Sequence, residues 1–184
     1  MNDNLQPSGS AYFITKPTAT PERHTLSVLV DNEPGILARI AGLFSARGFN
    51  IDSLTVSETE HEKGRSRITV VTVARPRVLA QIKLQLERLV PVYKVHDLTE
   101  EGQSLERELA LVKVASKGDD RVEALRLADA FRAQVVDASI DSFVFEITGK
   151  SSKIEQFISL MMPLGLVEVV RTGVVAISRG SAKM

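Results

Sequence analysis

The chain of 184 residues contains no cysteine and no tryptophan, and it has only three histidines. Without cysteine it has no disulfide, no thiolate metal ligand and no cysteine nucleophile, which fits a reducing compartment. The histidines, His24, His61 and His96, are scattered and do not show the spacing of metal ligands. We therefore expect no metal site in this chain.

Long apolar runs and an excess of charge are also missing. No run approaches the roughly 18–20 residues that span a bilayer, and the N-terminus lacks the pattern of a signal peptide. We expect a cytoplasmic protein. Lysine and arginine total 23 and so do aspartate and glutamate, so there is no general basic field to attract phosphate backbones. Nucleic acid is therefore not an expected partner.

Recognisable catalytic motifs are absent from the sequence. It has no GxSxG elbow, no Walker loop and no GxGxxG fingerprint. We predict no catalytic residue, although carboxylates that folding brings together would escape such a scan.

The length and the hydrophobic fraction of 43% allow two packed domains. Residues 1–23 are polar and rich in proline, and we expect a mobile leader there. Residues 99–104 (TEEGQS) are the candidate linker. Two segments of similar length, 24–98 and 105–184, remain as the predicted domains.

Apolar periodicity predicts the same βαββαβ order in both segments. In the first, a strand at 25–30 is followed by a turn, and a helix with Asn32 or Glu33 as its cap and Pro34 in its first turn. Gly48 is placed for a left-handed cap at the end of that helix. The next predicted strand, 49–57, changes its alternation at Asp52, which suggests a bulge.

The remaining predicted elements complete both units. In the first unit a charged loop at 58–65 precedes a strand at 68–73, a helix from Pro76 and a strand at 90–98. In the second, a capping box at Ser152 to Glu155 predicts the start of the last helix. The fold class is thus α+β, with two antiparallel sheets that carry both helices on one face. The opposite face of each sheet needs cover, which implies association.

The turn from Asn32 to Gly35 is the strongest candidate for a binding site. A glycine at a helix start lets backbone N–H groups approach a ligand, and the helix N-terminus favours a carboxylate. From the turn alone, an ordinary strand-to-helix connection is the favoured reading. Asn50 has both donors and acceptors, and a second strand lying beside the first would bring it toward the turn. An ordinary polar residue at a strand start is an equally good reading of Asn50.

Four arginines form a basic cluster around the third strand: Arg65, Arg67, Arg75 and Arg77. We interpret the cluster as a solvated face or a partner contact, since glutamates lie beside it and no aromatic residues are interleaved for base stacking. His61, in the neighbouring loop, is expected to be solvated.

Three stretches of the sequence resemble one known family. They are LSVLVDNEPGILARIAGLFSARGFNIDSLTV from Leu26, RELALVKV from Arg107 and RTGVVAISRG from Arg171. Together they are similar to the small subunit of acetolactate synthase (acetohydroxyacid synthase), whose first domain is an ACT domain. The resemblance implies two ferredoxin-like βαββαβ domains in tandem, and it covers about 25–180.

The resemblance implies a regulatory subunit without activity of its own. Such subunits associate with a thiamine-diphosphate-dependent catalytic subunit, activate it and confer feedback inhibition by a branched-chain amino acid, usually valine. Thiamine diphosphate, Mg and FAD are then expected only in the catalytic partner. ACT domains of this kind form dimers with the effector at the interface. Its implied contacts are Asn32, Gly35, Asn50 and Ile51, with Ile36, Ile51 or Leu54 as the apolar wall of the pocket.

Two alternatives belong to different classes. A tandem-ACT amino-acid-sensing transcriptional regulator would need a DNA-binding segment, and neither a helix-turn-helix pattern nor a basic charge supports one. A small ferredoxin-like enzyme would need a cluster of buried ionisable groups, which the sequence does not reveal.

Overall fold

The computed structural model describes residues 20–60, 64–100 and 104–181. Most of the predicted leader 1–23, the middle of the loop 58–65 with His61, and the centre of the linker 99–104 lie outside the described residues. The elements of the N-terminal domain are β1 (Glu22–Asp31), α1 (Ile36–Ser45), β2 (Ser53–Glu60), β3 (Arg65–Ala74), α2 (Pro76–Glu87) and β4 (Val92–Asp97). Those of the C-terminal domain are β5 (Ser104–Ala115), α3 (Gly118–Ala130), β6 (Gln134–Ala138), β7 (Ser142–Gly149), α4 (Ser151–Met161), a 3-10 turn (Met162–Leu164), β8 (Leu166–Arg171) and β9 (Val175–Ser178).

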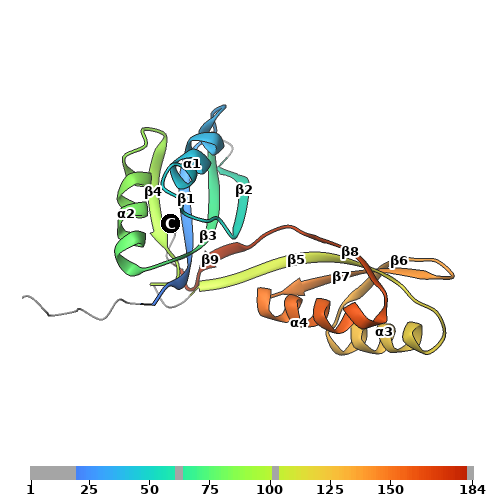
Figure 1. Cartoon of the computed structure of the whole chain (residues 1–184). Helices are drawn as coiled ribbons and strands as arrows, with labels where there is room; N and C mark the ends of the chain where they lie inside the picture. The colour runs from blue at the N-terminus through green and yellow to red at the C-terminus, as the bar shows by residue number, and fades with distance from the viewer. Residues whose placement is uncertain (1–19, 61–63, 101–103, 182–184) are drawn as a thin grey trace, which may run out of the picture.

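Both domains have the predicted βαββαβ order and an antiparallel sheet (Figure 1). The strand orders, β2-β3-β1-β4 and β6-β7-β5-β8, are the same arrangement used twice. The predicted α+β class with two ferredoxin-like domains is therefore confirmed. The order also corrects one expectation, because β3 separates the second strand from the first.

Alternating apolar residues on the strands and the helices' apolar stripes form one core in each domain. Leu26, Val28 and Val30 of β1 are fully buried beneath Ile40 and Phe44 of α1. Such side chains each contribute roughly 1.5–3 kcal/mol when they leave water, so these faces fix the strand register. The core of the second domain includes Ala110, Val112, Val114, Phe145, Ile147 and Phe157.

β5 and β9 connect the two domains. The C-terminal part of β5 belongs to the second sheet, whereas Ser104–Arg107 pairs with Val175–Ser178 of β9 as a separate two-stranded ribbon. This ribbon runs beneath the N-terminal domain, beside β1 and β3 (Figure 1). Thr25 and Thr69, on the sheet face without helices, are 0% and 4% exposed. The chain itself thus covers much of this face in the N-terminal domain, whereas Leu111 and Val170 of the second sheet are 37% and 55% exposed.

Two local predictions also differ from the structure. β2 begins at Ser53, so Phe49 and Ile51 lie in the preceding loop and pack against the core from there. The phase change at Asp52 thus marks the strand start and not a bulge. At α4 no side chain caps the helix, because it begins one residue before the expected box, at Ser151.

None of the described helices is both long and apolar enough to span a membrane.

Candidate functional site

The turn between β1 and α1 projects from the end of the N-terminal sheet, where Asn32 and Gly35 are exposed. Asn32 donates its backbone N–H to the Gly64 carbonyl at 2.8 Å, which ties the turn to the start of β3. Beside it the Tyr93 hydroxyl donates to Asp31 at 2.6 Å, and this carboxylate raises the pKa of Tyr93. These bonds hold the turn in place on the strand ends.

Gly35 is the cap residue of α1 and adopts the left-handed conformation, with φ of 87°. The predicted caps Asn32 and Glu33 were wrong, because the helix begins only at Ile36. No side chain accepts a hydrogen bond from the first turn of α1. The Ile36 N–H is directed at the Glu33 carbonyl at 3.4 Å, whereas the N–H groups of Leu37 and Ala38, together with the positive end of the helix dipole, remain available for a carboxylate. A Cβ on Gly35 would meet no other atom within 4 Å, so the approach to these groups is open.

The apolar candidate residues lie beneath the surface. Ile36 is 6% exposed and belongs to the core, and Ile51 and Leu54 are partly buried against the same core. Each leaves only a small area for a ligand.

Asn50 lies in the loop after α1, where it is exposed. Its side-chain amide donates to Asp52 at 2.5 Å, and its carbonyl accepts a hydrogen bond of 2.6 Å from Thr72. Gly48 begins this loop with φ of 66°, the predicted left-handed conformation. The loop is thus a defined structure with a carboxylate and an amide at its surface.

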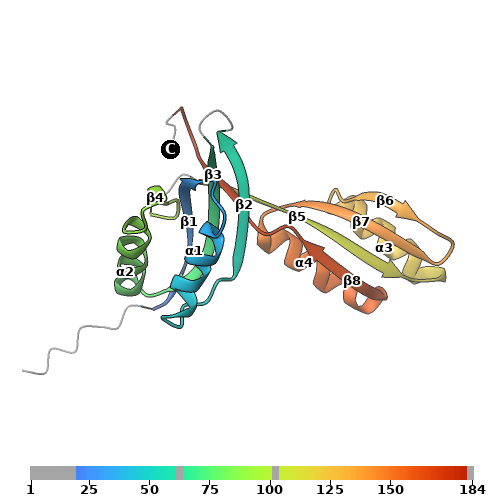
Figure 2. The same ribbon diagram turned by 90° about the horizontal axis from the view of Figure 1, so that it is seen from above.

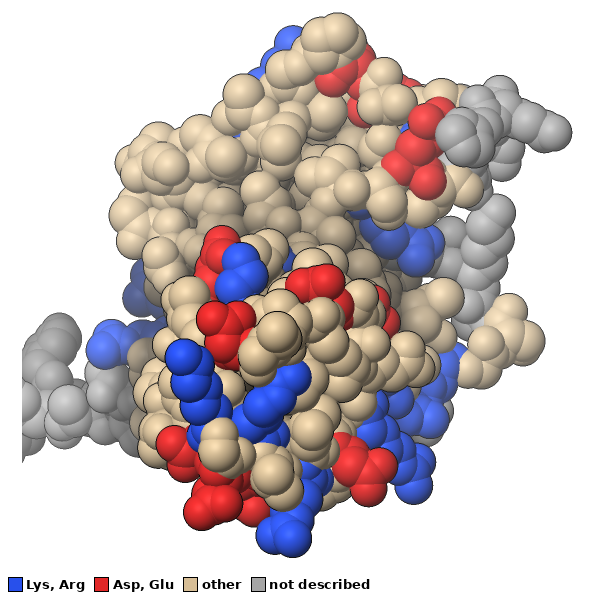
Figure 3. All heavy atoms as spheres, turned by 90° about the vertical axis from the view of Figure 1, so that its right-hand side faces the viewer, with Lys and Arg blue, Asp and Glu red and all other residues tan. Residues whose placement is uncertain are grey.

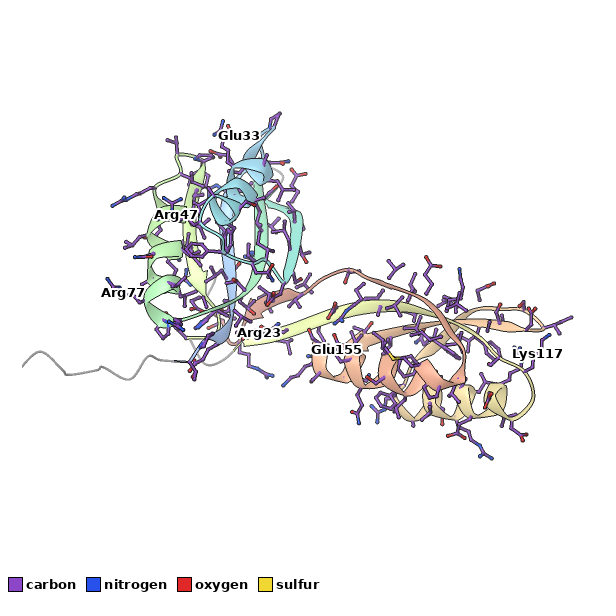
Figure 4. The ribbon with its side chains drawn as sticks, in the orientation of Figure 1. Arg23, Glu33, Arg47, Arg77, Lys117 and Glu155 are labelled. Atoms are coloured by element: carbon purple, nitrogen blue, oxygen red, sulfur yellow. The ribbon has the colours of Figure 1, made fainter. Side chains whose placement is uncertain are left out.

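The two groups of candidates are at opposite ends of the domain. Asn32 follows the end of β1 next to Arg65, whereas Asn50 is bonded to Thr72, which pairs with the start of β1 at His24. A strand rise of about 3.3 Å per residue separates them by about 20 Å. Glu33 and Arg47, which flank α1, lie toward its two ends (Figure 4). The expectation that the sheet brings Asn32, Gly35 and Asn50 together within one chain was wrong.

The junction between the domains lies beside the Asn50 loop. Ser53 accepts a hydrogen bond of 2.8 Å from the Val174 N–H, and Gly173 approaches so closely that a Cβ would meet the Ser53 and Thr55 hydroxyls at 2.9 Å. Arg23 pairs with Glu106 at 3.0 Å. Three residues after Asn50, the chain is thus in contact with the segment that leads to β9.

A partly buried ion pair closes the other side of the junction. Arg171 donates to both carboxylate oxygens of Glu108, at 2.7 and 2.8 Å, and also bonds Glu155. Glu108 is 5% exposed, and the Arg171 hydrogen bonds lower its pKa, with Ser151 assisting. Arg23 and Glu155 face each other across the junction (Figure 4). The sequence analysis missed this ion pair. Glu108 is two residues before the buried Ala110 on β5, so strand alternation places its carboxylate on the buried face, and that signal could have identified it.

The predicted basic cluster is divided among several roles. Arg65 lies over the Tyr93 ring at 3.9 Å, and Arg67 is half-buried on the sheet face without helices. Arg75 and Arg77 are exposed at the start of α2. The expectation of one solvated face therefore holds only for the last two.

Metal-binding clusters of titratable groups are absent from the part of the chain that the structure describes. No three His, Asp or Glu side chains gather there as a metal site would require. His24 is buried and bonded to Asp97 at 3.0 Å, at the edge of the sheet and away from the turn. The arrangement suits binding through backbone and amide groups. The fold and the turn define a two-domain protein of the ACT class.

Comparison with known families gives the particular assignment. The model described as "AHAS small subunit-like ACT domain" matches residues 26–94, and "Small subunit of acetolactate synthase" matches 107–180. A probable acetolactate synthase small subunit of Archaeoglobus fulgidus is 47% identical over 161 residues, which cover 88% of this chain and 99% of the relative. The acetolactate synthase small subunit of Mycobacterium leprae is 48% identical over 157 residues, 85% of this chain and 92% of that one.

A solved structure agrees in shape as well as in sequence. The acetolactate synthase small subunit of Thermotoga maritima superposes with a TM-score of 0.78 at 39% identity, covering 88% of this chain and 99% of that chain. The protein belongs to the family of acetolactate synthase small subunits. It is thus of the regulatory type and not the catalytic one.

Proposed function

We propose that this chain activates a catalytic acetolactate synthase subunit and confers feedback inhibition on it by valine, bound between the ACT domains of two copies. Thiamine diphosphate chemistry belongs to the catalytic partner, and both act in the cytoplasm. The observation that carries the proposal is the separation of the two half-sites. The open turn at Gly35 and the Asn50 loop lie at opposite ends of α1, so neither alone can enclose an amino acid.

In a dimer with twofold symmetry the two half-sites would come together. β2 is an edge strand, and α1 lies on its side of the domain while α2 lies on the β4 side (Figure 2). Antiparallel pairing of two β2 edges would set the two α1 helices side by side in opposite directions. The Gly35 turn of one copy then meets the Asn50 loop of the other.

The surface at this edge supports the pairing. Leu37 of α1 and Val56 of β2 are 41% and 44% exposed, although both are apolar. On the side from which Figure 3 is drawn, the N-terminal domain presents a broad area with few charged residues, whereas charges of both signs alternate over the C-terminal domain. An apolar edge of this kind is typical of a subunit interface.

The chemistry of the two half-sites suits a zwitterionic ligand. The first-turn N–H groups of α1 donate hydrogen bonds to the carboxylate, and the Asn50 and Asp52 side chains accept hydrogen bonds from the ammonium. The exposed edges of the core contact the aliphatic chain. Because the site exists only between copies, binding changes the free energy of association.

Substitution of the turn tests this function in the reconstituted enzyme. We expect Asn32→Ala to abolish or weaken valine inhibition at least about tenfold while activation of the catalytic subunit persists. Glu33→Gln, an exposed change in the same turn, is the matched control. Enzyme reconstituted with this variant should be inhibited by valine as the wild type is. Inhibition curves that Asn32→Ala leaves unchanged would remove the site assignment.

A further inference from the structure

A cleft lies on the face of the N-terminal sheet that carries no helices. It has a volume of about 320 Å³ and opens between β2 and β3 on one side and the β5–β9 ribbon on the other. The sheet side presents four hydroxyl groups, from Thr55, Ser57, Thr59 and Thr69. Because these residues point away from α1, the cleft is separate from the proposed valine site.

The cleft holds polar groups without partners. The Arg67 Nε and the Thr55 hydroxyl oxygen are both buried, and neither has a hydrogen-bond partner among the residues that the structure describes. Arg107 also lines the cleft and donates a hydrogen bond of 2.7 Å to the Glu106 carbonyl, and no carboxylate of the described residues pairs with its charge. Two arginines and a threonine thus line the cleft, and its described lining residues offer them no carboxylate.

The remaining walls are apolar. Leu105, Val175, Ala176 and Ile177 come from the ribbon, and Val175 and Ile177 are 49% and 56% exposed. Among the described residues that line the cleft there is no aspartate or glutamate, so these residues would not neutralise an ammonium group. The volume is at the lower end of those of ligand sites, which suits a small molecule.

We propose that this cleft binds a small aliphatic monocarboxylate. The carboxylate accepts hydrogen bonds from Arg67, Arg107 and the Thr55 hydroxyl, and the alkyl chain lies against Leu105 and Ile177. A free amino acid is disfavoured because its ammonium would lose water without gaining an acceptor. The site is independent of the proposed valine site and does not require a second copy.

Titration of the full-length chain with 3-methylbutanoate, followed by amide NMR, tests the proposal. We expect saturable shifts at Thr55–Thr59, Arg67 and Val175–Ile177, without shifts at Asn32–Leu37. Arg67→Gln should weaken binding at least about tenfold, since it removes a charge-assisted contact. Arg77→Gln, an exposed arginine on α2 (Figure 4), is the matched control and should bind as the wild type does.

A series of ligands separates the contribution of the carboxylate from that of the alkyl chain. Acetate lacks the alkyl chain and 3-methylbutanol lacks the charge, and both should bind more weakly by about tenfold or more. If Arg67→Gln unfolds, Thr55→Val, which removes only the hydroxyl, provides the second variant and should bind 3-methylbutanoate several-fold more weakly. No saturable shift with the wild type, shifts confined to the α1 turn, or full affinity in both variants would overturn the proposal.

Discussion

Two glycines in one short segment have opposite physical roles. Gly35 has φ of 87° and shapes the exposed turn, whereas Gly42 lies inside α1 with an ordinary helical backbone. A Cβ would meet no atom within 4 Å at either position. Steric clash is thus the same for both, and only backbone conformation distinguishes them.

Alanine at these two positions should therefore change stability in opposite directions. Gly35→Ala is expected to cost about 1–2 kcal/mol, because an alanine in the left-handed region is strained. Gly42→Ala should add about 0.5–1 kcal/mol through helix propensity. Urea denaturation of both variants measures the difference, and a shift of the same sign in both would contradict the assigned conformation.

The ion pair between Glu108 and Arg171 predicts a pH dependence. Hydrogen bonds from Arg171 lower the pKa of Glu108 below its usual value, so the pair stabilises the folded state above the ordinary glutamate pKa. That contribution is lost as the pH falls through the lowered pKa. Glu108→Gln should lower the free energy of unfolding by about 2–3 kcal/mol at pH 7. The difference in this free energy between variant and wild type should become smaller in acid.

Unfolding curves from pH 7 down to below the usual glutamate range would show this narrowing. Lys113, exposed and paired with Glu168 at 3.0 Å, offers a control: Lys113→Gln should change stability by less than about 1 kcal/mol. A difference for Glu108→Gln that stays constant with pH would show that the charge is not what stabilises the junction.

At the scale of elements, periodicity predicted the helices and most strands, because an amphipathic element must turn its apolar side to the core. It failed where an element is defined by a distant partner. Val175–Ser178 has only four residues, and its pairing with Ser104–Arg107 depends on chain segments about seventy residues apart. The start of β2 was misplaced since Phe49 and Ile51 are apolar for packing from a loop.

The segment that leads into the β5–β9 ribbon packs closely against the N-terminal sheet, and this contact can be tested. Gly173 and Gly180 both have left-handed φ, 83° and 85°, but only at Gly173 would a Cβ meet the N-terminal sheet, at 2.9 Å from Ser53 and Thr55. Gly173→Ala should loosen the domain junction and raise hydrogen exchange at β9 well beyond the effect of Gly180→Ala. Equal exchange in the two variants would mean that the close approach does not hold the domains.

At the scale of the whole molecule, the candidate site illustrates a limit of sequence reasoning. The residue types at Asn32, Gly35 and Asn50 allowed a binding site, and only the family resemblance implied that its ligand is an amino acid. Their positions at opposite ends of α1 depend on strand order, and local patterns do not fix strand order. The proposed site therefore needs a second copy of the chain.

Association of the chain with itself is the first consequence. Sedimentation at micromolar concentration should show a species of at least two chains, since an apolar edge formed by α1 and β2 is otherwise left in water. Val56→Lys, which places like charges opposite each other across the twofold axis, should shift the species toward the monomer. A monomeric wild type, with or without valine, would contradict the interface.

Mixing two defective variants tests the central claim most directly. Asn32→Ala and Asn50→Ala each damage both sites of their own dimer, but a mixed dimer has one site with both asparagines intact. Calorimetry should detect little valine binding by either variant alone. After subunit exchange the mixture should bind valine at about a quarter of the wild-type stoichiometry, as random pairing predicts. A mixture that binds no better than the separate variants would contradict a site shared between two copies.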